Sequence, residues 1–475
     1  MQTMLLAPTH PHAAPPGPAW LRAALAGLGD AMRRHRRTIQ AMQWAVVGIY
    51  LTLLAVPVLL PLPSRTAHIW NNMTVAAEFA FWGLWWPFVL LSMVLIGRTW
   101  CGVFCPEGAL TEAASRFSLN RALPHWLTWR GWPFTAFVCT TVYGQMVSVY
   151  QYPAPALLIL GGSTAAAVAV GLLYGRNKRV WCRYLCPVNG VFALLAKLAP
   201  VHYRVDAEAW DASRRDPRPP AVNCAPLVPI RTMQGASACH MCGRCSSYRG
   251  AIALSPRSPQ HEVVNVAGTR ANAWETALIL FGLMGVAVGA FHWSASPWLV
   301  AAKQYVADTL VEAGVVWPLE RAAPWWLLTN YPAQNDVLTL LDGAMLLGYI
   351  AATTIVCGTV LSAILAASVR LAGAWSWPRF HHLAQALIPM AGCGVFLGLS
   401  ATTVSLLHAD GLDWPDGVAA IRTLMLAGAV LWSGWLAWGI AGRWISGPRR
   451  AAVAAGTALA AAASGFCWVL LFWIW

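Results

Sequence analysis

Long apolar segments separated by shorter polar ones make up most of the chain. An apolar run of about twenty residues is long enough to cross the roughly 30 Å hydrocarbon core of a membrane as a helix. We therefore expect each run of that length to be a membrane-spanning helix. Nine runs qualify, and they cover residues 40–60, 76–97, 132–150, 154–174, 272–293, 336–369, 381–408, 417–441 and 452–474.

This pattern predicts an all-α polytopic membrane protein with about nine transmembrane helices. It divides the chain into a tail (1–38), the first four helices (39–200), a polar segment (201–270) and the last five helices (271–475). The composition agrees, because 58% of the residues are hydrophobic and 11% are charged. A soluble domain carries about 25% charged residues.

The first twenty residues lack the basic, apolar and small-residue order of a cleaved signal peptide. Their proline and alanine content is typical of a disordered tail. The next stretch, WLRAALAGLGDAMRRHRR, is expected to form a short interfacial helix before the first span.

Basic residues are distributed unequally between the two sides of the predicted bundle. With the N-terminus in the cytoplasm, all but four of the 32 Lys and Arg residues lie on the cytoplasmic side, as the positive-inside rule requires. The four exceptions are Arg65, Lys303, Arg321 and Arg422. This orientation accounts for the net charge of +14, so no nucleic-acid partner is expected. The predicted location is the bacterial inner membrane.

The predicted topology separates the twelve cysteines into two groups. Four lie inside spans and are expected to pack as small apolar residues: Cys139, Cys357, Cys393 and Cys467. The other eight lie in segments assigned to the cytoplasm: Cys101, Cys105, Cys182, Cys186, Cys224, Cys239, Cys242 and Cys245. Cytoplasmic thiols stay reduced, so metal ligation is favoured over disulfides. Eight thiolates suit two 4Fe–4S clusters.

The most closely spaced cysteines are Cys239, Cys242 and Cys245, in CHMCGRC. Cys-x2-Cys-x2-Cys opens the bacterial ferredoxin motif, which a fourth cysteine followed by proline normally completes. Zinc sites more often use two separated cysteine pairs, so an iron–sulfur cluster is the preferred interpretation. Arg249 stands where the fourth cysteine would be, and Cys224 is the nearest candidate to replace it.

A second motif, Arg-x-Trp-Cys-x3-Cys-Pro, occurs at residues 98–106 and again at 179–187. Each copy comes after an apolar run and resembles the closing half of a ferredoxin motif. Pro106 and Pro187 are suited to the first position of a helix, and a helix N-terminus there would face an anionic cluster. The first arginine of each copy is available to neutralise cluster or headgroup charge. The alternative is a pair of interfacial turns that happen to contain thiols.

Together these motifs resemble the membrane-bound polyferredoxins of the NapH/NosR/YccM type, over about residues 76–260. Those proteins combine membrane helices with two cytoplasmic Cys-x3-Cys-Pro motifs and a ferredoxin-like segment, here 201–270. The resemblance implies electron transfer between the membrane or cytoplasm and a periplasmic redox or metal-binding partner. Two features depart from the group, because this chain has one incomplete ferredoxin motif and no segment long enough for the flavin domain of the NosR members.

Two groupings of the eight cysteines stay open. In the first, helix pairing joins both Cys-x3-Cys-Pro motifs over one cluster, and Cys224 completes a second cluster with Cys239, Cys242 and Cys245. In the second, the two sets exchange ligands, as they do in two-cluster ferredoxins.

The last five helices carry fewer reactive groups. Haem ligation is considered, with packing or interfacial roles preferred, for His292, His408, His381 and His382. Intramembrane polar residues are costly unless they are paired, and the candidates for a quinone or proton site are Asp336, Asp342, Gln385 and Arg422. The outer loop 294–335 is amphipathic and rich in tryptophan, and is expected to lie on the membrane surface, where it can dock a periplasmic protein.

The favoured function is electron transfer, and the chain is expected to be a component rather than a stand-alone enzyme, because no nucleophile, acid–base pair or phosphate loop is evident. The alternatives are an accessory subunit of a periplasmic reductase, and a sensor or transporter with structural clusters. Residues 380–411 are similar to the ferredoxin-like membrane subunits of Ftr-type ferrous-iron uptake systems. That resemblance implies iron uptake alongside an iron permease. An electron from the outer face then needs a relay across the membrane, which the sequence does not identify.

Overall fold

The computed structural model describes residues 17–64, 66–213, 221–412 and 415–475. The start of the expected tail and Arg65 lie outside this range. Within it, eight helices are long and apolar enough to cross a membrane. In chain order they are α2 (Arg36–Leu59); α3, η1 and α4 (Met73–Glu78, Phe79–Trp85 and Trp86–Ile96); α8, η3 and α9 (Pro153–Ala156, Leu157–Gly161 and Gly162–Leu173); α13, η9 and α14 (Ala273–Ala277, Leu278–Val286 and Ala287–His292); α17 (Leu340–Leu371); α18, η11 and α19 (Trp377–Ala384, Gln385–Leu387 and Ile388–Ala409); α20 (Pro415–Ala441); and α21 with η12 (Pro448–Val469 and Leu470–Ile474).

The all-α membrane fold is confirmed, and eight of the about nine predicted spans are present as long apolar helices in the described residues. The expected span 132–150 is α7 (Trp132–Met146), a helix of 15 residues. The chain turns after Met146, and Ser148 adopts a left-handed conformation with φ of 50°. Val147 and Val149 then join a buried cluster that includes Tyr50 of α2, instead of continuing the helix. Hydropathy counts these valines as helical because it does not distinguish an apolar turn from an apolar helix.

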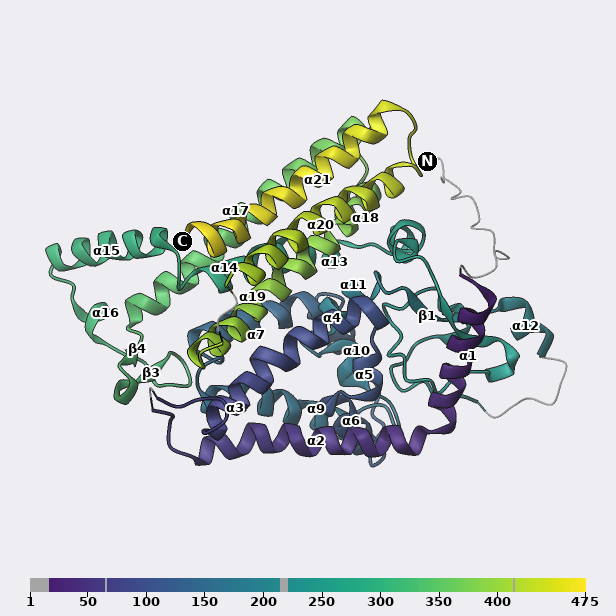
Figure 1. Ribbon diagram of the computed structural model, residues 1–475, viewed down its shortest axis with the longest axis horizontal. Helices are drawn as coiled ribbons and strands as arrows, with labels where there is room; N and C mark the ends of the chain where they lie inside the picture. Colours follow the sequence, from purple (N-terminus) through teal and green to yellow (C-terminus); the bar gives the residue numbers. More distant parts are fainter. Residues whose placement is uncertain (1–16, 65, 214–220, 413–414) are drawn as a thin grey trace.

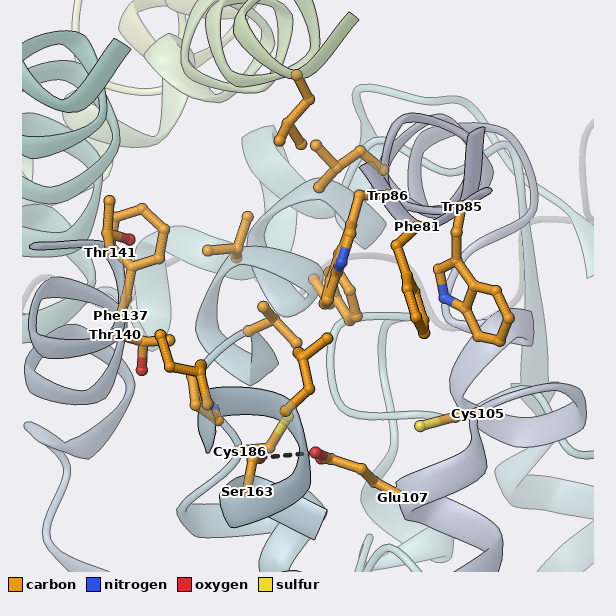
Figure 2. A pocket seen from close by; sticks show the side chains of 18 of the residues that line it. Phe81, Trp85, Trp86, Cys105, Glu107, Phe137, Thr140, Thr141, Ser163 and Cys186 are labelled. Carbon is orange, nitrogen blue, oxygen red and sulfur yellow. Dashed lines mark hydrogen bonds between the residues drawn. The ribbon is translucent and has the colours of Figure 1, made fainter. Parts of the chain in front are cut away.

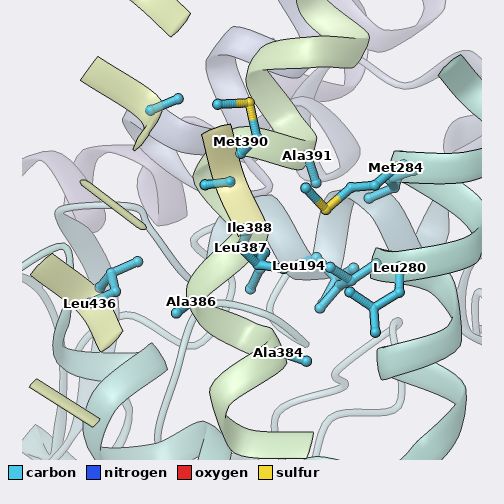
Figure 3. Close-up of a cluster of buried hydrophobic side chains, with 14 of the residues drawn as sticks. Leu194, Leu280, Met284, Ala384, Ala386, Leu387, Ile388, Met390, Ala391 and Leu436 are labelled. Carbon is cyan, nitrogen blue, oxygen red and sulfur yellow. The ribbon is translucent and has the colours of Figure 1, made fainter. Parts of the chain in front are cut away.

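The C-terminal helices α17, α20 and α21 run side by side, and α19 lies between them and the N-terminal helices (Figure 1). The largest buried cluster joins both halves of the chain. Figure 3 shows its centre, where Leu280 and Met284 of η9 face Ile388 and Met390 at the start of α19. Shared burial of these apolar side chains makes the two halves one packed unit.

A two-stranded sheet lies toward one end of the molecule (Figure 1), and the chain between its strands carries Cys224, Cys239, Cys242 and Cys245. Strand β1 (Val201–Val205) pairs antiparallel with β2 (Ile252–Pro256), with Tyr203 opposite Leu254. Helix α12 (Ala207–Ala212) follows β1. The predicted N-terminal helix is present as α1 (Ala19–Arg34), and it packs against β2.

The opposite end of the bundle carries α15 (Pro297–Glu312), α16 (Trp317–Glu320) and the short hairpin β3–β4 (Asn330–Tyr331 and Asp336–Val337) (Figure 1). Ser296 caps α15 by accepting a hydrogen bond from the Leu299 N–H at 3.4 Å, and none of the helix's residues is buried. The C-terminal Trp475 lies here too, because its ring contacts Trp298. The amphipathic segment 294–335 therefore contains the helices α15 and α16 and lies at the end of the molecule opposite β1.

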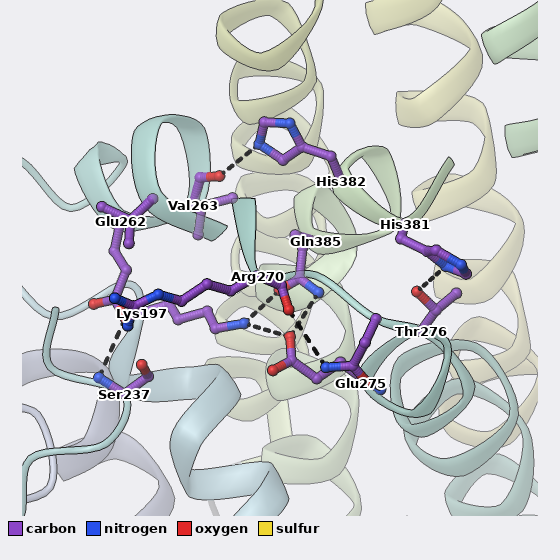
Figure 4. Close-up of polar contacts among 12 residues, drawn as sticks. Lys197, Ser237, Glu262, Val263, Arg270, Glu275, Thr276, His381, His382 and Gln385 are labelled. Atoms are coloured by element: carbon purple, nitrogen blue, oxygen red, sulfur yellow. Dashed lines mark hydrogen bonds and ion pairs between the residues drawn. The ribbon is translucent and has the colours of Figure 1, made fainter. Parts of the chain in front are cut away.

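Three of the four polar residues singled out in the last helices have structural partners. Asp342 and Thr339 form a capping box at the start of α17, and Asp336 accepts a hydrogen bond from the Tyr152 hydroxyl at 2.8 Å. Gln385 accepts one from Lys197 and donates one to Glu275 (Figure 4). The guanidinium of Arg422 lies 3.9 Å from the centre of the Phe472 ring.

Two of the four histidines considered for haem bond to protein groups near the Gln385 network (Figure 4). His381 Nδ1 lies 2.9 Å from the Thr276 hydroxyl, and His382 Nε2 lies 2.9 Å from the Val263 carbonyl. His292 is buried at the opposite end of the bundle, with its ring against Trp468 and Trp475. These contacts support packing roles for His292, His381 and His382.

Candidate iron–sulfur sites

The two Cys-x3-Cys-Pro motifs form nearly the same local structure. Helix α5 (Thr99–Val103) carries Cys101 and α10 (Val180–Tyr184) carries Cys182. Each short helix ends in a tight turn that brings in the second cysteine, since the N–H of Cys105 donates to the Trp100 carbonyl and that of Cys186 to the Trp181 carbonyl. All four thiols line one cavity, and we call this set the helix-end site (Figure 2).

The two motifs differ in the backbone directly after the second cysteine. Pro106 is the first residue of α6 (Pro106–Ser115), as predicted, and the Gly108 N–H donates to Cys105 Sγ at 3.3 Å. Pro187 is not a first helical residue, because α11 (Asn189–Ala196) starts two residues later. A turn bonded between the Asn189 N–H and the Cys186 carbonyl precedes that helix. The Asn189 side chain donates to the Arg183 carbonyl and accepts from Arg98.

The remaining four cysteines line a second cavity, and we call them the loop site: Cys224, Cys239, Cys242 and Cys245. They lie on irregular chain between β1 and β2, where Met241 and Gly243 have φ of 52° and 76°. Cys239 Sγ accepts a hydrogen bond from the Met241 N–H at 3.4 Å. Arg249, at the position of the usual fourth cysteine, stacks over the rings of Trp210 and Tyr248.

The structure thus brings the eight cysteines together in the first of the two groupings expected from the sequence. In the described parts of the chain, no three His, Cys, Asp or Glu side chains are arranged to hold a single metal ion. A cubane binds each thiolate at a different iron, so its four ligands stand farther apart than the ligands of one ion. Two cavities with four thiols each have the donor set of two such clusters.

Burial disfavours the charged form of these thiols. It raises the pKa of Cys182 to about 12, despite the nearby Arg179, and in the loop site it raises the pKa of Cys245 to about 12, with Cys242 adding to the effect. Burial is also the main cause that raises the pKa values of Cys105, Cys186 and Cys239. Such thiols ionise only when a cation replaces the proton, and a coordinating metal does so. The donor sets therefore fit a cofactor that brings positive iron into each cavity.

Two buried arginines and a histidine surround the cysteine sites. Arg98 donates to the Ser237 carbonyl, and Arg179 donates to the Cys101 carbonyl and to Glu112. Among the described residues, three of their buried donor or ring nitrogens have no hydrogen-bond partner: Arg98 Nε, Arg179 Nη2 and His240 Nδ1. Buried donors are normally satisfied, and an anionic cluster would supply acceptors. The sequence indicated the role of both arginines but not of His240, which lines both cavities.

The two sites meet at Gly102. A side chain at this position would collide with the His240 carbonyl and would lie 2.9 Å from the Cys242 nitrogen. Glycine therefore allows the backbone of the loop site to pack directly on α5. No sequence signal marks this residue, because Arg183 occupies the equivalent position in the second motif.

Two carboxylates that the cysteine motifs do not include hold the sites in place. Glu107 accepts hydrogen bonds from Ser163 at 2.6 Å and from the Trp181 indole at 3.1 Å (Figure 2), and burial raises its pKa. Glu112 pairs with Arg179 of the second motif and with Arg244 of the loop site, each at 2.7 Å. Neither glutamate was predicted from the sequence, and the one signal for them was their position in the segment directly after Cys105.

The cavity of the helix-end site extends beyond the cysteines into the membrane helices. Its volume is about 260 Å³. Aromatic side chains form much of the wall, including Phe81, Trp85 and Trp86 of one span and Phe137 of α7 (Figure 2). Polar groups in the lining include the hydroxyls of Thr140, Thr141 and Ser163 (Figure 2), together with Arg98, Glu107 and His240 near the cysteines. The helix-end site is therefore continuous with an apolar space inside the bundle.

Comparison with known proteins supports the binding of an iron–sulfur cluster. A 4Fe–4S binding domain family matches residues 79–124 and 157–205, the two segments that contain the helix-end site. The chain is 25% identical over 227 residues to YccM of Escherichia coli strain K12, named as an electron transport protein, and 26% identical over 184 residues to the regulatory protein NosR of Pseudomonas aeruginosa. These alignments cover 42% and 34% of this chain, and 62% and 25% of the relatives. No solved structure matches the chain.

These matches confirm the resemblance to membrane-bound 4Fe–4S polyferredoxins that the cysteine motifs indicated. Residues 380–411, which resemble the membrane subunits of iron-uptake systems, lie outside the segments that the 4Fe–4S domain family matches.

Proposed function

We propose that this protein is a membrane-bound iron–sulfur electron-transfer component that takes electrons from a lipid-soluble quinol bound in its large cavity. The observation that carries this proposal is the continuity between the helix-end cysteines and an apolar, aromatic-walled space of about 260 Å³ among the membrane helices. The similarity to YccM, named as an electron transport protein, supports the general class.

The cavity has the chemistry of a quinone site. Small-molecule sites are mainly apolar and aromatic, with a few polar groups that orient the ligand. A quinol ring can stack on Trp85, Trp86 and Phe81, while Thr140 and Thr141 offer hydroxyl partners for its oxygen atoms. The long apolar tail of a natural quinol keeps it in the membrane, where the cavity lies.

In this proposal the helix-end site holds one 4Fe–4S cluster and the loop site holds the other, each with its own four cysteines. Such clusters supply one-electron transfer at potentials that the protein sets through charge and hydrogen bonds. Arg98, Arg179 and the contact at Gly102 serve both sites. The excess of Lys and Arg at the cysteine end supports a cytoplasmic location for both clusters in a bacterial inner membrane.

The test is to add a short-chain quinol to the purified protein in lipid nanodiscs. Bleaching of the cluster absorbance measures the rate of reduction. Ala287→Phe places a large side chain in the cavity wall and is expected to slow quinol reduction by about tenfold or more, with dithionite reduction unchanged. Leu91→Phe, on the exposed face of α4, is the matched control and should reduce at the wild-type rate. A wild-type protein that dithionite reduces and quinol does not would refute the quinol proposal.

A quinol also removes a difficulty with the periplasmic roles expected from the sequence. A quinol diffuses within the membrane and carries electrons itself, so no fixed electron relay across the roughly 30 Å hydrocarbon core is needed. The exposed α15 at the end opposite the cysteines supports docking of a periplasmic redox or metal-binding protein there.

The ferrous-iron uptake role is a second proposal, and it is supported only by the similarity of residues 380–411. Deleting the gene and measuring radio-iron accumulation from ferrous iron tests it. Reduced uptake supports iron import with an iron permease. Normal uptake combined with loss of a periplasmic reductase activity supports the accessory-subunit alternative.

A further inference from the structure

We propose that Glu78 and the small cavity around it form an intramembrane proton relay from the large cavity to the end of the molecule opposite the cysteines. The proposal rests on quinol oxidation in the large cavity. It adds a direction for the protons, and Glu78 and Thr74 are the residues that carry them.

Glu78 lies inside the second span, at the junction of α3 and η1. In the described chain its carboxyl group makes no hydrogen bond or ion pair. An ionisable side chain is expensive at such a position and usually marks an ion or proton path. Glu107, the carboxyl group at the large cavity, differs because Ser163 and Trp181 both hold it.

A second unpartnered group points to water beside Glu78. The hydroxyl of Thr74, one helical turn before Glu78, is buried and has no partner among the described residues. Both side chains line a cavity of about 30 Å³. A buried water needs at least about 10–15 Å³ of such space and two or more polar partners. The small cavity therefore has room for about two waters, with Glu78 and Thr74 as partners.

The small cavity adjoins the large one. Four residues line both: Phe81, Trp82, Val149 and Tyr150. Tyr150 is the one among them with a hydroxyl group, and it belongs to the turn after α7 that replaces the end of the expected span. A proton that leaves the large cavity can pass the Tyr150 hydroxyl and reach the Glu78 carboxylate.

The other end of the small cavity leads out of the membrane helices. Gln151 lines it and is exposed, and Tyr152 lines it while donating a hydrogen bond to Asp336 of β4. Both residues lie beside the β3–β4 hairpin, because Tyr152 stacks on Tyr331 at 3.6 Å between ring centres. Figure 1 shows α3, β3 and β4 toward the end opposite β1 and the cysteine sites.

Quinol oxidation supplies the protons in the correct number. Conversion of one quinol to quinone breaks two O–H bonds and releases two electrons and two protons. The electrons leave toward the cysteine end, one for each of the two proposed clusters, and two molecules of a one-electron oxidant then accept them. The protons leave in the opposite direction through Glu78, so turnover separates charge across the membrane.

The experiment uses the full protein in lipid vesicles, with a pH-sensitive dye inside and ferricyanide, a membrane-impermeant one-electron oxidant, outside. Only molecules whose cysteine sites face outward are reoxidised, so the vesicle interior corresponds to the Glu78 end. Adding decylubiquinol should acidify the interior when wild-type protein is present and not in empty vesicles. We expect Glu78→Gln to lower both interior acidification and ferricyanide reduction by about tenfold, and Thr74→Val to lower them less.

Asp308→Asn is the matched control, because Asp308 is an exposed carboxylate on α15 at the same end, and it should acidify the interior like the wild type. Dithionite reduction of the clusters, recorded by EPR, should be the same in all variants and shows that Glu78→Gln is folded. If Glu78→Gln does not fold, the rate of interior acidification in Thr74→Val becomes the test. A rate equal to that of the wild type would then overturn the relay. Two results would overturn the relay and leave quinol oxidation standing. In the first, the wild type reduces ferricyanide with quinol but does not acidify the interior. In the second, Glu78→Gln acidifies the interior as fast as the wild type. No quinol-dependent reduction in the wild type overturns both.

Discussion

The helix-end site and the loop site each gather four cysteines, but different forces hold them. In the helix-end site, two copies of one motif fold locally into a short helix and a tight turn, and the membrane helices before them fix their positions. The loop site has no regular secondary structure of its own. Residues with positive φ, including Met241 and Gly243, bend its chain, and contacts from distant segments hold it in place.

Two of those contacts are especially direct. The carboxylate of Glu262, buried behind the loop, pairs with Arg257 at 2.5 Å and accepts hydrogen bonds from the backbone N–H groups of Ala236 and Ser237. On the other side, Asp30 of α1 accepts hydrogen bonds from Ser246 and Ser247. The comparison teaches that a repeated local motif builds one site, whereas the other depends on a buried ion pair and a docked helix.

The strongest test of this division is removal of one cysteine from each site. Cys182→Ser should lose the helix-end cluster and Cys239→Ser the loop cluster, so each variant keeps about four of about eight irons. Iron and sulfide analysis with EPR distinguishes the two remaining clusters. A wild-type content of about four irons, or loss of the same EPR signal in both variants, would contradict two separate sites.

The second test removes the ion pair behind the loop site. Glu262→Gln leaves the Arg257 guanidinium buried without its counter-ion, which typically costs about 3–5 kcal/mol. The loop cluster should be lost on heating at a much lower temperature, while the helix-end cluster changes little. Asp211→Asn, in the exposed pair with Arg231, is the control and should cost under about 1 kcal/mol. Equal loss of both clusters in Glu262→Gln would mean that the sites do not unfold separately.

A smaller effect is expected from glycines on α1. A methyl group at Gly29 would lie 2.9 Å from the Ser246 hydroxyl, so Gly29→Ala should weaken docking of α1 and destabilise the loop site by about 1–3 kcal/mol. Gly27 lies on the same helix with nothing within 4 Å, and Gly27→Ala should stabilise the helix by about 0.5–1 kcal/mol. Thermal loss of the loop cluster measures both. The two substitutions should shift the temperature of cluster loss in opposite directions. Equal shifts would argue against docking of α1.

The smallest effect is a dependence of the loop site on pH. Burial alone would raise the pKa of Glu262, but Arg257 and the hydrogen bonds outweigh it, and the pKa lies below its ordinary value. The stabilisation is therefore fully present above the ordinary glutamate pKa of about 4.3 and is lost as pH falls through the lower folded value. Acid titration of cluster absorbance should show this loss in the wild type and a weaker one in Glu262→Gln. The same profile in both would exclude Glu262 as the cause.

Local patterns were sufficient for much of this protein. Hydropathy located eight long helices because the length of an apolar run is a property of the chain itself. Cysteine spacing identified the donor sets for the same reason, and Cys224 joins the loop cavity as its position in the chain suggested. The same local patterns were wrong about the end of α7, because burial of Val147 and Val149 in a turn ends that helix early. They were also wrong about Pro187, because the hydrogen bonds of Asn189 form a turn before α11.

The tertiary structure alone decided which groups share a space. Gly102 is unremarkable in the sequence, and its importance comes from the His240 carbonyl that a side chain would strike. Glu262 meets the loop site only when the chain returns to it through β2. The walls of the large and the small cavity both combine α2 and η1 with the turn after α7, and the large cavity adds α7 and the helices around the cysteines. A cavity is the volume that side chains from distant segments leave unfilled, so no single stretch of sequence records it.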